Sequence, residues 1–374
     1  MGEILKINNL PSPSWSWLKI NDAELEFDVP LKVIEPAEIT EIKNESEVQI
    51  VKEIPNQVRD DSSTENVILN SFQNLPELLS GTGNASDSIF EGEAPLGIII
   101  PANKKIEKPV VLNYDFKNGE NALTNQIVVA EENSESTLIF VCSSDENAGG
   151  FQALRTKVFA KSGAKIKVVK VQLLGKKFIQ IDDTASYVAE NASFELTHVE
   201  LGGEKVYIGA GCNLKEYNGS FKSNLGYYLK DEQFLDLNFI VNHIGKKTLC
   251  RMNVAGSLKD KAQKTYRGTI DFKKGSCGSD GDEQEETLLL SPDVVNNSMP
   301  VILCTEEDIS GEHGATIGRL SDEMLFYMQS RGISKTESEK IIAKAKVQAV
   351  VSTIDDEKTV EKINSRMNLI FGED

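Results

Sequence analysis

A histidine and a run of acidic residues are the side chains best suited to hold a metal ion. His313 stands among small residues in segment 311–316, which we expect to be a loop between the final β coil and the first C-terminal helix. A metal or a partner can approach its ring there, and imidazole is a good ligand for iron and zinc. Segment 280–286 is dense in carboxylates, with Glu283, Glu285 and Glu286 at its end, and the glycines at 275, 278 and 281 indicate a flexible loop. A cation that takes oxygen ligands, such as ferrous iron, would relieve their repulsion. The alternatives are a hydrogen-bonded histidine closing a β coil and a solvated acidic turn.

Two of the five cysteines are candidates for sulfur or iron chemistry as thiolates. Cys277 lies beside the acidic run, and Cys304 precedes His313 on what we expect to be the last strand; an ordinary structural cysteine is the alternative for each. The remaining three are expected in the core: Cys142, Cys212 and Cys250. No CxxC pair occurs, which argues against a disulfide framework, a zinc ribbon or a self-contained ferredoxin site. Reduced thiols indicate the cytoplasm.

Composition narrows the function further. The 374 residues carry a net charge of −18, which repels nucleic acid and anionic membranes and favours a protein partner or a cation. The chain start lacks the pattern of a secretory signal, and no apolar run is long enough to span a membrane. No nucleotide-binding loop is present. We expect no catalytic residue.

A β-solenoid is the fold that these elements favour. Short runs rich in Val, Ile, Thr and Phe recur from residue 89 to about 303, separated by Gly, Asn, Asp and Ser. A pattern of a turn followed by a strand recurs at intervals of roughly 20 to 30 residues, as stacked coils would require. A β-sandwich is the alternative. We therefore expect a right-handed parallel β-helix over 86–316, after a poorly regular lead-in over 1–85.

Residues 317–374 are expected to form a small helical domain. Ser321 can cap a helix that runs to Arg331, and Ser334 opens a capping box for a second helix reaching Val351. Thr353 is the expected cap of a third helix. That helix has an apolar face at helical spacing: Val360, Ile363, Met367 and Ile370.

Several short motifs resemble the SufB/SufD family of iron–sulfur cluster assembly proteins. They are segments 266–270 (YRGTI), 288–291 (LLLS), 313–316 (HGAT) and 325–333 (LFYMQSRGI), with 241–248 (VNHIGKKT) further upstream. The resemblance is specific over roughly 230–345. Aligned through Pro300, Glu285 stands where SufB proteins carry an interface cysteine, which favours a SufD-like member.

The resemblance implies a non-catalytic scaffold subunit that carries a transient iron–sulfur cluster or iron, with no cofactor permanently bound. It implies a second SufB/SufD-type subunit, as a homodimer or heterodimer, and a SufC-type ATPase, with a sulfur donor protein as a further partner. His313 would lie at the subunit interface where the cluster forms. The ATPase would bind a helical cluster that also has the apolar bulk to pack on the following helices: Leu325, Phe326, Tyr327, Arg331 and Ile333.

A cytoplasmic β-helix enzyme acting on carbohydrate is the alternative function. Such enzymes use two carboxyl groups as acid and base, and Asp182 with Asp183, or Asp280 with Asp282, could supply them. The helical tail argues against this alternative.

Overall fold

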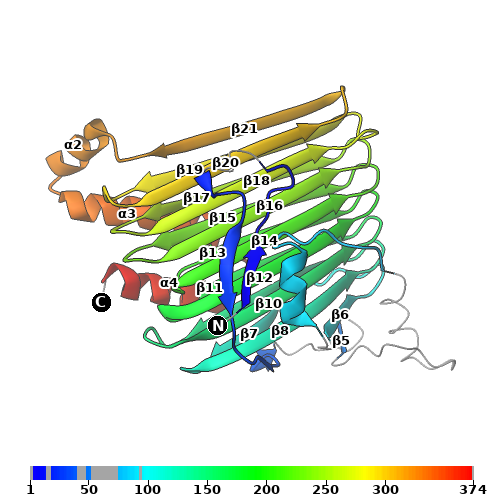
Figure 1. The fold of residues 1–374 in the computed structure, drawn as a ribbon, viewed down its shortest axis with the longest axis horizontal. Coiled ribbons are helices and arrows are strands. Elements are labelled where there is room, and N and C mark those ends of the chain that lie inside the picture. The colour runs from blue at the N-terminus through cyan, green and yellow to red at the C-terminus, as the bar shows by residue number, and fades with distance from the viewer. Residues whose placement is uncertain (1–2, 14–17, 40–47, 52–74, 92–94, 373–374) are drawn as a thin grey trace.

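The computed structural model describes residues 3–13, 18–39, 48–51, 75–91 and 95–372. Its main body is a parallel β-solenoid of about 8 turns, which confirms the solenoid prediction over the sandwich. Each coil contributes one strand to each of two sheets, and every strand from β8 onward pairs in parallel with the strand two places before it. Figure 1 shows the coils stacked from β6 and β7 at one end to β20 and β21 at the other.

From β6 onward, the even-numbered strands form one sheet, here called the even sheet, and the odd-numbered strands form the other, called the odd sheet. The even sheet consists of β5 (Gln49–Val51), β6 (Leu96–Ile100), β8 (Glu120–Ala130), β10 (Gly149–Ala160), β12 (Lys177–Val188), β14 (Lys205–Leu214), β16 (Phe234–His243), β18 (Gln263–Phe272) and β20 (Val295–Cys304), with β3 (Lys32–Val33) beside β8. The odd sheet consists of β4 (Glu38–Ile39), β7 (Val110–Phe116), β9 (Glu135–Ser144), β11 (Lys165–Leu173), β13 (Ser193–Glu200), β15 (Ser220–Leu229), β17 (Leu249–Leu258), β19 (Ser279–Leu289) and β21 (Ile309–Gly318).

Side chains in register stack in columns inside the solenoid, because successive residues of a strand point to opposite faces. The core contains the three cysteines expected there, and Cys142, Cys212 and Cys250 are all buried. At one edge of the solenoid, each of several turns has one residue with a left-handed backbone conformation. In several coils this residue is an asparagine, whose short polar side chain tolerates that conformation. Stacked asparagines bond across coils, as from Asn218 Nδ2 to Asn191 Oδ1 at 2.9 Å.

Three C-terminal helices follow the solenoid: α2 (Asp322–Ser330), α3 (Lys335–Val351) and α4 (Glu357–Phe371). Of these, α3 and α4 cover the outer face of the odd sheet, where they pack on Val169, Val199 and Tyr228. Ser321 and Ser334 cap α2 and α3 as predicted. The cap predicted for the third helix is wrong: Asp356, and not Thr353, accepts from the backbone of Thr359 at 2.8 Å. The apolar face predicted for α4 does pack on the sheet.

The N-terminal segment crosses the outer face of the even sheet, as the blue strands in Figure 1 show. Strands β1 (Glu3–Ile7) and β2 (Ala23–Phe27) form an antiparallel hairpin there, followed later by the 3₁₀ helix η2 (Asn84–Phe90). Arg267 of β18 holds this segment. Its guanidinium pairs with Asp236 at 2.6 Å and donates to the carbonyl oxygens of Ile20 and Asp22.

The VNHIGKKT segment closes one coil through a buried histidine. His243 ends β16, its Nδ1 lies 2.7 Å from the Thr248 hydroxyl across the turn, and its ring stacks on Phe272. Burial lowers the pKa of His243 to about 4. The folded protein therefore holds this ring neutral at pH values where the unfolded chain would bind a proton.

His243→Gln should remove a pH-dependent part of the stability. Between pH 6.5 and 4 the unfolded state binds a proton that the folded state does not, so the wild type loses stability as pH falls through this window. We expect the free energy of unfolding of the wild type, relative to His243→Gln, to fall by about 3 kcal/mol from pH 7 to pH 4. Denaturant titrations at several pH values measure the two free energies of unfolding. A difference between them that stays constant with pH would contradict the lowered pKa of His243.

Candidate functional site at the open end of the solenoid

The last coil leaves two strands without an outer neighbour. Among the described residues, β20 pairs only with β18 and β21 only with β19, so both sheets end in an open edge. Inner strands are almost entirely buried, whereas β20 and β21 are half-buried or exposed along most of their length. Figure 1 shows β21 as the outermost strand of the stack.

His313 lies on β21, which corrects the prediction of a loop between the last coil and the helices. In the parallel ladder its register partner is Glu283 of β19. Gly311 faces the interior ring of Phe272, and Gly314 faces the exposed side chain of Gln284, so odd-numbered positions of β21 point inward. His313 is therefore stacked over Glu283 in one interior column, at the end that is open to solvent.

The acidic run forms strand β19 and not the flexible loop or acidic turn that the sequence suggested. Alternation divides its carboxylates between two faces. Glu283 and Glu285 point into the solenoid and are buried, while Glu286 is exposed and pairs with Lys346 of α3. Asp280 pairs with Arg251 at 2.6 Å. The repulsion expected in a loop is thus relieved by separation and by ion pairs.

Glu283 is a buried carboxyl group with spare acceptor capacity. Its Oε2 has no hydrogen-bond partner among the described residues. Burial, reinforced mainly by the neighbouring Glu285 carboxylate, raises the pKa of Glu283 to about 8. The carboxyl fills the space beside Gly268, where a Cβ would lie 2.2 Å from Glu283 Oε1. The glycine of the YRGTI motif therefore makes room for Glu283.

Glu285 has the opposite environment, because every one of its close partners donates to it. Lys264, fully buried on β18, forms an ion pair with Glu285, and the Thr287 and Ser298 hydroxyls also donate to the carboxylate. Burial lowers the pKa of Lys264. Lys264 was not predicted from the sequence, because only the packing of the two sheets against each other brings it to Glu285.

The cysteine candidates lie toward the turn that joins β20 to β21. Cys304 is exposed at the end of β20, which is the penultimate strand and not the last as predicted. It is the register partner of Phe272, whose ring contacts the backbone at Gly311, so Cys304 lies at the same rim as His313. The Cys277 thiol donates to Asp308 in the turn, and this hydrogen bond raises its pKa, which disfavours the thiolate.

The helix α2 presents its large side chains to solvent. Phe326 is 73% exposed and Tyr327 is 58% exposed, so they do not pack on the following helices as one interpretation of the sequence held. Arg331 lies over the Tyr327 ring, while Leu325 and Ile333 are half-buried. Met328 is the buried residue of α2.

No group of three or more His, Cys, Asp or Glu side chains is arranged to hold a metal ion within the described part of the chain. The open end therefore offers an incomplete set of donors. One acid–base pair of the enzyme alternative, Asp182 with Asp183, also fails on geometry. Asp182 points inward to Lys170, whereas Asp183 points outward to Arg155 at 3.2 Å, so the two act on opposite faces of β12.

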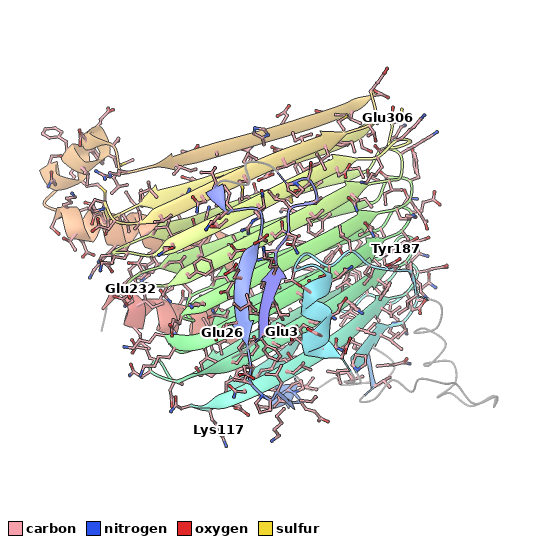
Figure 2. The ribbon with its side chains drawn as sticks, in the orientation of Figure 1. Glu3, Glu26, Lys117, Tyr187, Glu232 and Glu306 are labelled. Atoms are coloured by element: carbon pink, nitrogen blue, oxygen red, sulfur yellow. The ribbon has the colours of Figure 1, made fainter. Side chains whose placement is uncertain are left out.

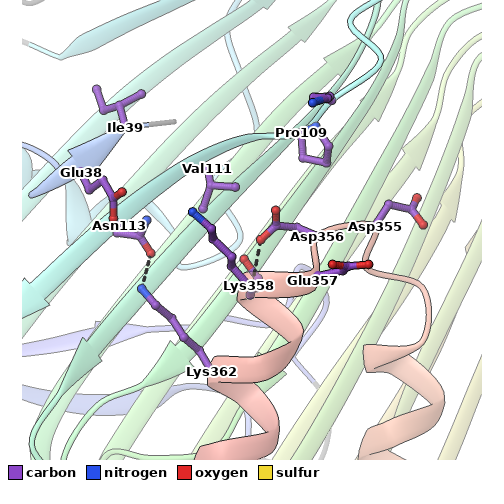
Figure 3. Close-up of a pocket in the computed structure, with 12 residues that line it drawn as sticks. Glu38, Ile39, Pro109, Val111, Asn113, Asp355, Asp356, Glu357, Lys358 and Lys362 are labelled. Atoms are coloured by element: carbon purple, nitrogen blue, oxygen red, sulfur yellow. Dashed lines mark hydrogen bonds between the residues drawn. The ribbon is translucent and has the colours of Figure 1, made fainter. Parts of the chain in front are cut away.

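A surface pocket of about 930 Å³ lies at the other end of the stack, between β7 and the start of α4 (Figure 3). Lys362 donates to Asn113 at 2.7 Å, and Asp356 caps the helix, so these three polar groups help to hold α4. The lining of this pocket combines lysines with carboxylates, so it carries no charge of a single sign. None of the predicted site residues lines it.

Comparison with known proteins assigns the family. The family described as "SUF system FeS cluster assembly, SufBD core domain" matches residues 115–346. The chain therefore belongs to this SufB/SufD family, as its motifs predicted. No helix of the described residues is long and apolar enough to cross a membrane.

Individual relatives are distant. The iron–sulfur cluster assembly protein SufD of Bacillus subtilis is 21% identical over 278 residues, which cover 72% of this chain and 62% of the relative. SufB of the same organism is 22% identical over 268 residues, or 71% and 57%. An iron–sulfur cluster assembly SufBD family protein of Staphylococcus saprophyticus gives the same values as SufB. The chain thus spans about 60% of the length of these relatives, and their similarity does not separate SufB from SufD.

Lys264→Met should destabilise the fold strongly because it leaves the Glu285 charge buried without its counterion. Removing one partner of a buried pair costs about 3–5 kcal/mol, measurable as a shift in the denaturant midpoint. The double variant Lys264→Met/Glu285→Leu should recover most of this loss.

The exposed pair Lys261–Glu232, at 3.6 Å, supplies the matched control. Lys261→Met should leave the midpoint unchanged, since exposed ion pairs contribute little. Equal denaturant midpoints for Lys264→Met and the wild type would show that the buried pair does not contribute to stability.

Proposed function

We propose that this chain is a scaffold subunit on which an iron–sulfur cluster is assembled, with iron and sulfide as cargo and no permanently bound cofactor. The observation that carries the proposal is the stacking of His313 over Glu283 at the open end of the solenoid. An imidazole and, beneath it, a carboxyl group that would give up its proton to a bound cation are ligands that suit iron. The family assignment, to a cluster assembly domain, supports the same function.

A second SufB/SufD-type subunit would complete the site. The two edge strands offer unpaired backbone groups that another chain's strands can extend. Such pairing would place the partner's side chains over His313 and Cys304, and would add donors to those that the described residues offer at this end. Cys277, held as a thiol by Asp308, and Glu286, held by Lys346, are weaker candidates. A sulfur donor protein would deliver sulfur to this open end of the solenoid.

A SufC-type ATPase would bind α2, because nothing in the chain provides a nucleotide-binding loop and α2 exposes an apolar surface. Phe326 and Tyr327 form its centre. Large aromatic side chains beside an arginine, here Arg331, are typical of residues that dominate binding energy at protein interfaces. The scaffold itself is proposed to catalyse no reaction.

His313→Ala should lower cluster yield without altering the fold. The His313 residue is exposed on an edge strand, so its side chain contributes little to packing. The melting temperature of the variant should therefore match that of the wild type. Anaerobic reconstitution with iron and sulfide, in the presence of the subunit partner and the ATPase, measures cluster per complex by absorbance. A yield equal to that of the wild type would remove His313 from the site, and a parallel fall in melting temperature would make it a structural residue.

Phe326→Ala/Tyr327→Ala should abolish ATPase binding while leaving stability unchanged, because both rings are mainly solvent-exposed in the isolated chain. Titration of the ATPase against each protein, beside a thermal melt, measures both effects. Leu369→Ala on α4, which removes a side chain 63% exposed, is the matched control and should bind normally. Unchanged affinity in the double variant would exclude α2 from the interface.

A further inference from the structure

A cluster of lysines follows one edge of the solenoid over three successive turns, at residues 215–219, 244–248 and 273–278. These turns lie between the coil of Tyr187 and that of Glu306, both labelled at this edge in Figure 2. Backbone hydrogen bonds stack them, with Asn218 N donating to Lys246 O and Lys247 N to Cys277 O. We name this surface the basic corner, which consists of Lys215, Tyr217, Lys246, Lys247, Leu249, Lys273 and Lys274.

Most of the positive charge in the basic corner is unneutralised. Lys215, Lys246 and Lys274 are exposed and form no ion pair with any described residue. The carboxylate of Glu216, in the same turns, faces the coil below, where it accepts from the Tyr187 hydroxyl and from Glu190 N. Lys273 is the exception, since it pairs with Asp271.

Exposed apolar groups lie among these lysines. Tyr217 is 46% exposed and Leu249 is 40% exposed. The Lys247 ammonium lies 5.8 Å from the centre of the Tyr217 ring. A tyrosine and an aliphatic side chain within a charged surround resemble the apolar centre and polar rim of a protein–protein interface.

The basic corner is small and has acidic borders. Three coils at a strand spacing of about 4.8 Å span roughly 10 Å, close to the screening length at about 0.1 M salt. The next turn carries Glu306, Glu307 and Asp308, and the chain as a whole has a net charge of −18. A nucleic acid or a membrane, whose negative charge is extended, would overlap these borders and be repelled.

We propose that the basic corner is a docking surface for a protein partner that presents a compact acidic face with an apolar centre. The lysines would steer the partner and set its orientation, while Tyr217 and Leu249 would be covered by its apolar groups. This surface does not include α2 or the exposed edges of β20 and β21, although its last turn, 273–278, adjoins the turn that joins these two strands. The inference therefore goes beyond the proposed scaffold function and does not depend on cluster formation.

A labelled ten-residue peptide, with glutamates around two central leucines, serves as the probe in fluorescence anisotropy with the full chain. Binding should weaken steeply as salt is raised. Lys246→Glu/Lys274→Glu should weaken binding at least about tenfold, and Lys246→Gln/Lys274→Gln should weaken it less. A thermal melt of each variant verifies that these exposed turn positions leave the fold intact.

Lys104→Glu/Lys108→Glu makes the same change in net charge at exposed lysines of the first coil, and is the matched control. It should change the peptide's affinity by less than about twofold. An equal loss in both variants would show a non-specific charge effect and overturn the proposal, as would no binding by the wild type. Tighter binding of a short DNA duplex than of the peptide would also overturn it.

Discussion

A stack of parallel coils must end, and the unpaired edge at its end is the constraint on which the rest of this structure depends. Within the stack, each strand satisfies its backbone groups through the coils before and after it. The last coil has no such neighbour among the described residues, so β20 and β21 expose donors and acceptors that favour pairing with another chain. The same edge opens the interior columns to solvent, and His313 and Glu283 are adjacent members of one column.

The two outer faces of the stack are occupied in different ways. The helices α3 and α4 bury apolar residues against the odd sheet, and the N-terminal hairpin crosses the even sheet, held by Arg267. Because the described elements cover much of both faces, the open end, the exposed helix α2 and the turns at the edges of the coils are the surfaces that the proposed partners would use. Each proposed interaction uses a different one of these surfaces, so a variant in one need not disturb the others.

The sequence predicted the solenoid because its pattern of a turn followed by a strand recurs, and it predicted α2 and α3 because Ser321 and Ser334 have strong capping patterns. Thr353 failed as a cap because Asp356, three residues later, accepts the helix amide instead. The acidic run was assigned to a loop because charges on both faces of β19 conceal the alternation of a strand. Only the register with β21 shows that Glu283 lies under His313, and only the packing of the even sheet against the odd sheet brings Glu285 to Lys264.

The most direct test of the central claim is whether His313 ligates the assembled cluster. The complex is reconstituted with only this chain carrying ¹⁵N-labelled histidine, and the reduced cluster is studied by pulsed electron paramagnetic resonance. Of the three histidines, His198 and His243 are fully buried within the coils, so a ¹⁵N coupling is expected from His313 and should vanish in His313→Ala. Absence of a ¹⁵N coupling in the wild type, or its survival in the variant, would contradict the account.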